Sequence, residues 1–218
     1  MTGLAKASLR WRRPAILLVA LLLPSLVAAC GSTPTPAPTT LGAACLADTR
    51  APGRFPELEA LLPRGMIERS PDSVDSGANC TASSLGSYAS HGIGELRFAG
   101  ATWDYGNGDA TVAAVVEAAP IGPSLELAWV EEFYTVGAVN GRHTGEVKTS
   151  RPAMPGAGQV FRLETVNDLS LQTVVIWPAG RVVRVVIVAT TIGPDASRTA
   201  HDQRVQIAVE VAAGAPVP

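Results

Sequence analysis

The chain has 218 residues, of which 17 are basic, 19 are acidic and 47% are hydrophobic, and its formal net charge is −2. This length and apolar content suit one domain with a core of its own. Beyond residue 13 the basic residues form no cluster. The composition therefore argues against nucleic acid as a partner.

The first 29 residues have the layout of a secretory signal peptide. An apolar run at residues 15–23 follows a basic stretch, and Pro24 and Ser25 then interrupt it. The basic residues are Lys6, Arg10, Arg12 and Arg13. A membrane-spanning helix needs about 20 apolar residues, and this run is shorter. The pattern predicts a signal peptide that is cleaved during export.

Small residues precede Cys30 in the stretch Leu26-Val27-Ala28-Ala29-Cys30. This stretch resembles the lipobox of bacterial lipoproteins, and the resemblance covers the first 30 residues. It implies cleavage before Cys30 and a diacylglyceryl group on the Cys30 sulfur, which would hold the chain at the extracytoplasmic face of the cell membrane. Two alternatives stay open, namely ordinary secretion after cleavage nearby and an uncleaved anchor.

Residues 30–44 are rich in proline and threonine and are expected to form a tether. We expect the folded domain at residues 45–213, with residues 214–218 as a tail. Without the signal peptide, 13 basic and 19 acidic residues remain, so a second, electrostatic attachment to anionic lipid is not expected. Cys45 and Cys80 are an even pair that predicts a disulfide outside the cytoplasm. Two free thiols are the alternative.

The first half of the domain mixes helices and strands. Helices are expected at residues 55–63 and from residue 79 to about residue 92, with a brief strand at residues 66–69. Residues 101–105 and 110–117 flank the turn-forming cluster Gly106-Asn107-Gly108-Asp109 and predict a β-hairpin. Ser124 is expected to cap a helix that runs to about Val136.

The second half is richer in strands, which are expected at residues 159–166, 171–177 and 181–191, and more weakly at residues 144–149. Residues 182–183 and 185–188 are apolar without alternation, which is typical of a central strand covered on both faces. From Asp195 onward the pattern fits a helix, although Val205, Ile207, Val209 and Val211 also alternate like a strand. The order of elements predicts an α+β fold, with an antiparallel sheet packed against helices in a single compact domain.

Few residues suggest catalysis or a metal site. A group of serines lies near His91, but the strained-turn motif of serine hydrolases is missing. His91, His143 and His201 lack the spacing of a zinc site. Hairpin turns favour the same residue types as Asp104, Asn107 and Asp109, so a calcium site there is not expected. We expect no cofactor, no metal and no catalytic residue.

Adjacent pairs of polar and aromatic residues also have ordinary structural explanations. Glu131 and Glu132 would point about 100° apart on a helix, which suits a solvated face better than an acid–base pair. Trp103 and Tyr105 share one face of a strand and are expected to pack in the core or on the sheet.

Three hypotheses about function remain. The first is a non-enzymatic binding module at the cell envelope, whose partner is an envelope protein or a small apolar ligand. The second is an envelope hydrolase with its site near His91, and the third is a structural subunit of an envelope assembly. The tether and small cysteine-paired body also resemble uncharacterised bacterial surface lipoproteins, but no motif carries over any functional residue.

Overall fold

The computed structural model describes residues 45–141, 143–168, 170–193 and 197–218. The expected signal peptide, Cys30 and the whole of the expected tether lie outside the described residues. The described residues all belong to one compact unit.

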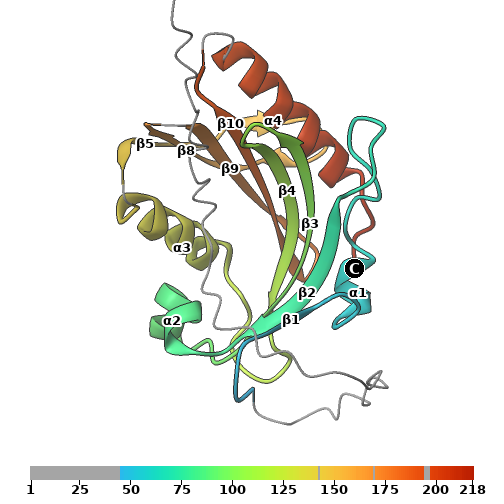
Figure 1. The fold of residues 1–218 in the computed structure, drawn as a ribbon. Coiled ribbons are helices and arrows are strands. Elements are labelled where there is room, and N and C mark those ends of the chain that lie inside the picture. The colour runs from blue at the N-terminus through green and yellow to red at the C-terminus, as the bar shows by residue number, and fades with distance from the viewer. Residues whose placement is uncertain (1–44, 142, 169, 194–196) are drawn as a thin grey trace, which may run out of the picture. The chain divides into compact units, whose positions relative to one another are not determined.

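Eight antiparallel strands form the main sheet, in the order β1-β2-β3-β4-β10-β9-β8-β5 (Figure 1). The fold is α+β, as predicted, and the sheet makes up most of it. The strands of the main sheet are β1 (Thr49–Ala51), β2 (Ser73–Asn79), β3 (Leu96–Gly106), β4 (Asp109–Ala118), β5 (Thr144–Ser150), β8 (Phe161–Asn167), β9 (Ser170–Ala179) and β10 (Val182–Thr191). A separate hairpin pairs β6 (Ala153–Met154) with β7 (Gly158–Gln159).

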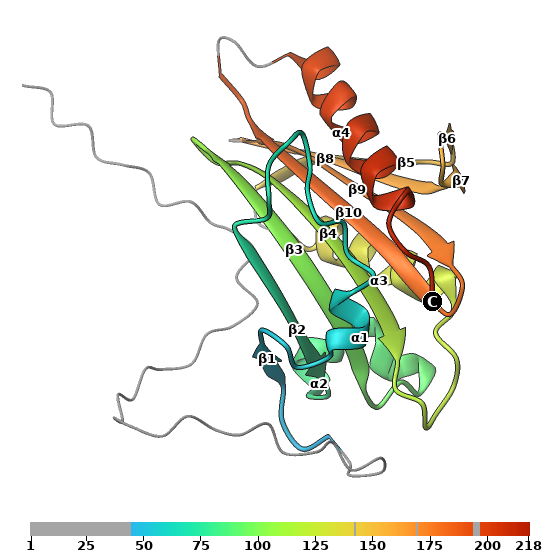
Figure 2. The ribbon, with the colours of Figure 1, turned by 90° about the vertical axis from the view of Figure 1, so that its right-hand side faces the viewer.

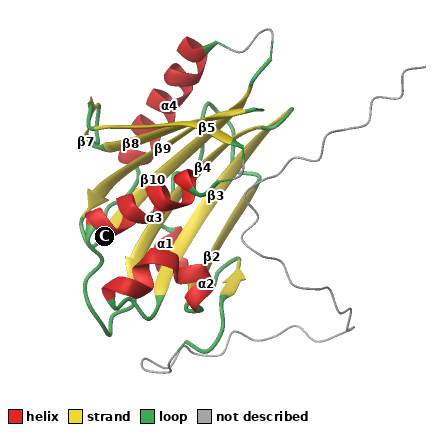
Figure 3. Cartoon of the chain, turned by 90° about the vertical axis from the view of Figure 1, so that its left-hand side faces the viewer, coloured by secondary structure: helices red, strands yellow, loops and turns green. Residues whose placement is uncertain are grey.

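Helices cover both faces of the sheet, so the body has three layers. Figure 2 shows α1 and α4 on one face, and Figure 3 shows α2 and α3 from the opposite side. The helices are α1 (Pro56–Glu59), α2 (Ala82–Leu85), α3 (Leu127–Val139) and α4 (Arg198–Ala213), and a 3₁₀ helix spans Gly86–His91. No helix in the described part of the chain is long and apolar enough to cross a membrane.

Two hydrophobic cores result from this arrangement. Beneath α1 and α4 the core contains Trp103, Val186 and Val209, whereas beneath α3 it contains Tyr88, Val130 and Val185. Strand β10 contributes alternate side chains to both cores and is buried along most of its length. The prediction of a central strand covered on both faces is therefore confirmed. Its neighbours β4 and β9 pair with it along nearly its whole length.

The predicted β3–β4 hairpin is confirmed, with Gly106, Asn107 and Gly108 all at positive φ in the turn. Such a turn matches the twist of the two strands and needs glycine or asparagine. The last segment is a helix, which resolves the ambiguity left by its alternating valines. Val205, Ala208, Val209 and Ala212 are its buried stripe.

Several local predictions differ from the structure. Helix α1 is shorter than expected and ends at Glu59, and the expected helix after Asn79 is two short pieces that stop at Gly92. Ser197 caps α4 by accepting a hydrogen bond from the Ala200 amide, and the expected cap, Asp195, lies outside the described residues. Ser124 caps nothing, because α3 begins after Glu126.

The expected strand at residues 66–69 is a tight turn closed by a Met66–Arg69 bridge. Ile67 and Glu68 both have positive φ. A β-branched residue such as Ile67 rarely adopts this conformation, so the local sequence does not indicate the turn. The predicted disulfide is present, since Cys45 is bonded to Cys80 with their Cα atoms 5.9 Å apart. It ties the segment before β1 to the end of β2.

The residues expected to form a tail also contact the body. Ala215 is buried, and the Arg184 guanidinium on β10 donates hydrogen bonds to the carbonyl oxygens of Ala215 and Pro216. The same side chain donates to the Leu61 carbonyl at 3.0 Å. Arg184 is 2% exposed. It therefore joins the C-terminal ends of α1 and α4, where the helix dipoles favour a cation.

Candidate functional site

A groove of about 500 Å³ runs between α4 and the segment that contains β6. We call it the α4 groove. Nine residues line it, namely Pro152, Ala153, Met154, Pro155, Arg162, Thr199, Asp202, Gln203 and Gln206. This volume lies within the range of pockets that hold small ligands. The groove joins segments far apart in the sequence.

One wall of the α4 groove is polar and is formed by α4. Thr199, Asp202, Gln203 and Gln206 follow the helical repeat, so they share one face of α4. The stripe that contains Val205 and Val209 packs on the sheet instead. Because the apolar stripe faces the sheet, the polar face of α4 points away from the core and lines the groove.

The opposite wall is mostly apolar. Residues 152–155 contribute two prolines, an alanine and the Met154 side chain. The β6–β7 hairpin holds this segment, and Gly156 and Gly158 in its turn have positive φ. The Val160 amide also donates to the Pro152 carbonyl at 3.0 Å. The two walls together make the groove amphipathic.

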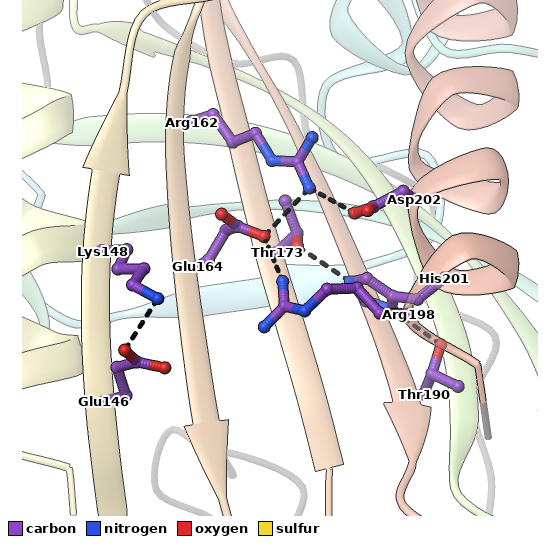
Figure 4. Close-up of polar contacts among 9 residues, drawn as sticks. All are labelled: Glu146, Lys148, Arg162, Glu164, Thr173, Thr190, Arg198, His201 and Asp202. Atoms are coloured by element: carbon purple, nitrogen blue, oxygen red, sulfur yellow. Dashed lines mark hydrogen bonds and ion pairs between the residues drawn. The ribbon is translucent and has the colours of Figure 1, made fainter.

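Alternating charges lie at the floor of the α4 groove (Figure 4). Arg162 on β8 donates from one nitrogen, Nη2, to Asp202 at 2.5 Å and to Glu164 at 3.0 Å. Glu164 also accepts a hydrogen bond from Arg198 at 2.9 Å. Two cations and two anions balance each other, so this network has no net charge.

A second charged pair lies on the neighbouring edge strand, β5. Lys148 contacts Glu146 at 2.8 Å, on the strand next to β8 in the sheet (Figure 4). Charged side chains on an edge strand discourage pairing with the edge of another chain. We therefore assign this pair a role in keeping the edge unpaired.

His201 lies beneath the α4 groove and is 1% exposed. Its Nε2 is 2.8 Å from the Thr173 hydroxyl on β9, and its Nδ1 is 2.9 Å from the Thr190 hydroxyl on β10. A neutral imidazole donates from one nitrogen and accepts at the other, so both hydroxyls can be satisfied. Burial lowers the pKa of His201 from its ordinary value of 6.5. His201 therefore fixes the first turns of α4 to the sheet.

The sequence analysis treated His201 only as a possible zinc ligand and missed this role. A signal was present, because His201 precedes Val205 by four residues and Ala208 by seven. That spacing places it on the buried stripe of a helix.

His91 has a carboxylate partner in the structure. Its Nε2 is 2.8 Å from Glu132 on α3, and its ring stacks on Trp129 with the centroids 4.7 Å apart. A serine hydrolase also needs a hydroxyl bonded to the histidine. Among the described residues no hydroxyl is hydrogen-bonded to His91, and the Ser90 hydroxyl donates instead to the Ser87 carbonyl.

Two other serines near His91, Ser83 and Ser84, serve local structure. Ser84 donates to Asp48, and Asp48 also accepts hydrogen bonds from the Cys80 and Thr81 amides at the start of α2. Ser83 lies 3.1 Å from the Thr81 hydroxyl. These contacts cap α2 next to the disulfide.

The two adjacent glutamates of α3 have different environments. Glu132 is exposed and pairs with His91, whereas Glu131 is buried and receives two hydrogen bonds from Arg151, at 2.8 and 2.5 Å. The expectation of a solvated face is therefore wrong for Glu131. The Glu131 and Glu132 side chains point in different directions, as the helix geometry predicted. Each of them holds α3 to a separate part of the body.

The turn residues considered for calcium have protein partners. Asp109 accepts hydrogen bonds from the Thr191 amide and from Arg204, both at 2.8 Å, and Asp104 accepts one from the Gly106 amide. Among the described residues no three or more His, Cys, Asp or Glu side chains group as metal ligands would.

The remaining candidates lie outside the α4 groove. Trp103 is fully buried and donates from its ring nitrogen to the Arg69 carbonyl. Tyr105 packs beneath two guanidinium groups, those of Arg69 and Arg204. His143 is exposed and lies 3.4 Å from Asp168. These contacts explain the aromatic residues by packing.

The chain was compared with protein-family models, with curated proteins and with solved structures, and nothing matched in any of the three comparisons. The function must therefore be inferred from the site itself.

Proposed function

We propose that this chain is a lipid-anchored extracytoplasmic protein whose body binds a ligand non-covalently in the α4 groove. The observation that carries the proposal is the amphipathic lining, with Met154 and two prolines facing Asp202 and Gln203. Ligand sites typically combine an apolar surface with a few polar groups that fix orientation. The sequence predicted an envelope protein or a small apolar ligand as the partner, and the polar wall of the groove favours an amphipathic ligand.

The location rests on the lipobox at Cys30, and the disulfide supports it. Disulfides persist in oxidising compartments outside the cytoplasm and are rare inside it. Replacing Cys30 by serine is expected to move the protein from the detergent phase to the aqueous phase in a phase-partition experiment. Unchanged partitioning would reject the lipid anchor.

The binding proposal is tested by native mass spectrometry of the full chain extracted from its own host in detergent. We expect a non-covalent adduct on the natural protein and its loss in Ala153→Trp, where an indole would fill the groove. Ala128→Trp is the matched control, since both alanines are exposed and Ala128 lies on α3, away from the groove. An adduct that survives in Ala153→Trp places the ligand elsewhere.

One observation favours the structural-subunit alternative. Helix α3 buries only Val130 and Glu131, and it exposes Val136 and Val139 to 44% and 64%. Exposed apolar residues on one helix are typical of a protein contact. Val139→Glu would then abolish co-purification of a protein partner without changing the adduct in the groove.

A further inference from the structure

The ligand class follows from the hydrogen-bonding groups that the α4 groove leaves unused. Arg162 makes both of its ion pairs through Nη2, and no described residue accepts a hydrogen bond from its other terminal nitrogen, Nη1. Figure 4 shows that nitrogen without a contact to the residues drawn. Arg162 thus keeps a donor for a ligand oxygen.

Asp202 keeps a complementary acceptor. Its Oδ1 receives the Arg162 hydrogen bond, and no described residue donates to Oδ2. The Asp202 side chain is 41% exposed and lines the groove. A ligand N–H group can therefore bind beside the position at which Arg162 holds a ligand oxygen.

The amide groups on α4 extend the same pattern. Gln203 is exposed, and no described residue is hydrogen-bonded to its side chain, so it offers both a donor and an acceptor. Gln206 donates to Glu210 at 2.8 Å and retains its oxygen as an acceptor. The groove therefore offers both donors and acceptors, which are the groups that a peptide backbone also carries.

Charge and length narrow the ligand class further. Arg162 already faces two carboxylates, so the groove attracts neither an anion nor a cation strongly. From Thr199 to Gln206 the helix rises about 10 Å at 1.5 Å per residue. That is the length of about three extended residues at 3.3 Å each.

We propose that the α4 groove binds a short, extended and uncharged stretch of peptide from a partner protein. Its carbonyl oxygen accepts from Arg162 Nη1, its N–H donates to Asp202, and an apolar side chain packs on Met154 and the prolines. None of the nine lining residues is aromatic, which disfavours a sugar ring as the occupant. This inference rests on the proposed binding function and names its ligand class.

The test is a titration of the full chain in detergent with a library of N-acetylated, C-amidated tetrapeptides, followed by backbone amide NMR. Cellotetraose, free glutamate and free lysine are titrated in parallel. We expect at least one capped peptide with an apolar residue to shift the amide signals of residues 199–206 and 152–155. The three other probes should leave these signals unchanged.

Two groove variants give the quantitative readout. Ala153→Trp and Gln203→Ala should each weaken peptide binding by about tenfold or more, and Ala128→Trp should change it less than twofold. Gln203→Ala removes only an exposed side chain, so it remains informative if the tryptophan disturbs the hairpin. The proposal would be overturned if both groove variants bound the peptide as tightly as the natural protein does. Preferred binding of cellotetraose or of a free amino acid would also overturn it.

The outcomes also separate this inference from the proposed function. An adduct from the host that is lost in Ala153→Trp, together with no binding of any capped peptide, rejects the peptide and keeps the groove as a ligand site. No adduct and no peptide binding reject both.

Discussion

Helices α4 and α3 lie on opposite faces of one sheet, but they bury different kinds of side chain and present different surfaces. Helix α4 buries an apolar stripe and fixes its first turns through His201, so its polar face is free to line the groove. Helix α3 buries Val130 and packs half-buried aromatic side chains on the other core, and Glu131 and Glu132 pair it with Arg151 and His91. Both helices thus combine apolar packing with polar contacts, but it is the polar face of α4 that lines the groove.

The largest expected effect is on the α4 side, at Arg184. Arg184→Ala leaves the carbonyl oxygens of Leu61, Ala215 and Pro216 without this donor, the first two of them in buried hydrogen bonds. We expect it to lower the free energy of unfolding by about 3–5 kcal/mol. Chemical denaturation measures this change. The control is Arg181→Ala, an exposed residue paired with Glu117, which should cost less than about 1 kcal/mol. Equal effects of the two variants would contradict the proposed role of Arg184.

A smaller loss of stability is expected on α3, where the adjacent residues Glu131 and Glu132 can be compared by the same substitution. Glu131→Ala removes two hydrogen bonds from a buried carboxylate and should cost about 1–3 kcal/mol. Glu132→Ala removes an exposed partner of His91 and should cost less than about 1 kcal/mol. The same denaturation experiment compares them. If Glu132 proves the more important, α3 is held mainly from the His91 side.

The next prediction concerns the pH dependence of the stability that His201 contributes on α4. Because burial lowers the pKa of His201, the unfolded chain takes up a proton that the folded chain resists. Stability from this histidine is therefore complete above about pH 6.5 and falls as the pH decreases below that value. Thermal unfolding of the natural protein and of His201→Gln from pH 7.5 to 4.5 measures the difference. A difference that stays constant with pH would reject this assignment.

The smallest expected effect concerns catalysis at the α3 corner. Hydrolysis of p-nitrophenyl acetate should be the same in the natural protein, in His91→Ala and in Glu132→Gln, because no described hydroxyl is hydrogen-bonded to His91. A loss of activity of more than about tenfold in both variants would restore the hydrolase hypothesis.

Local patterns explain which parts of the fold were predictable. The apolar run of β10, interrupted only by Arg184, and the Gly-Asn-Gly turn before Asp109 are both recognisable from local sequence alone. The prediction of a strand at residues 66–69 was wrong because tertiary contacts, including the Trp103 hydrogen bond to the Arg69 carbonyl, hold a turn there. Strand β2, rich in small and polar residues, has a weak signal of its own.

The α4 groove could not be predicted, because its walls come from segments about 40 residues apart in the sequence. Arg162 and Asp202 meet only after β8 and α4 have packed on the same face. The disulfide was predictable, since only one pairing remains once Cys30 is assigned to lipid.

Photo-crosslinking in the living host tests ligand binding in the α4 groove most directly. A benzophenone amino acid is introduced at Ala153, in the groove, or at Ala128, on the exposed surface of α3. Upon irradiation we expect a discrete covalent adduct from position 153 and none of the same mass from position 128. The same adduct from both positions, or from position 128 alone, would contradict binding in the α4 groove.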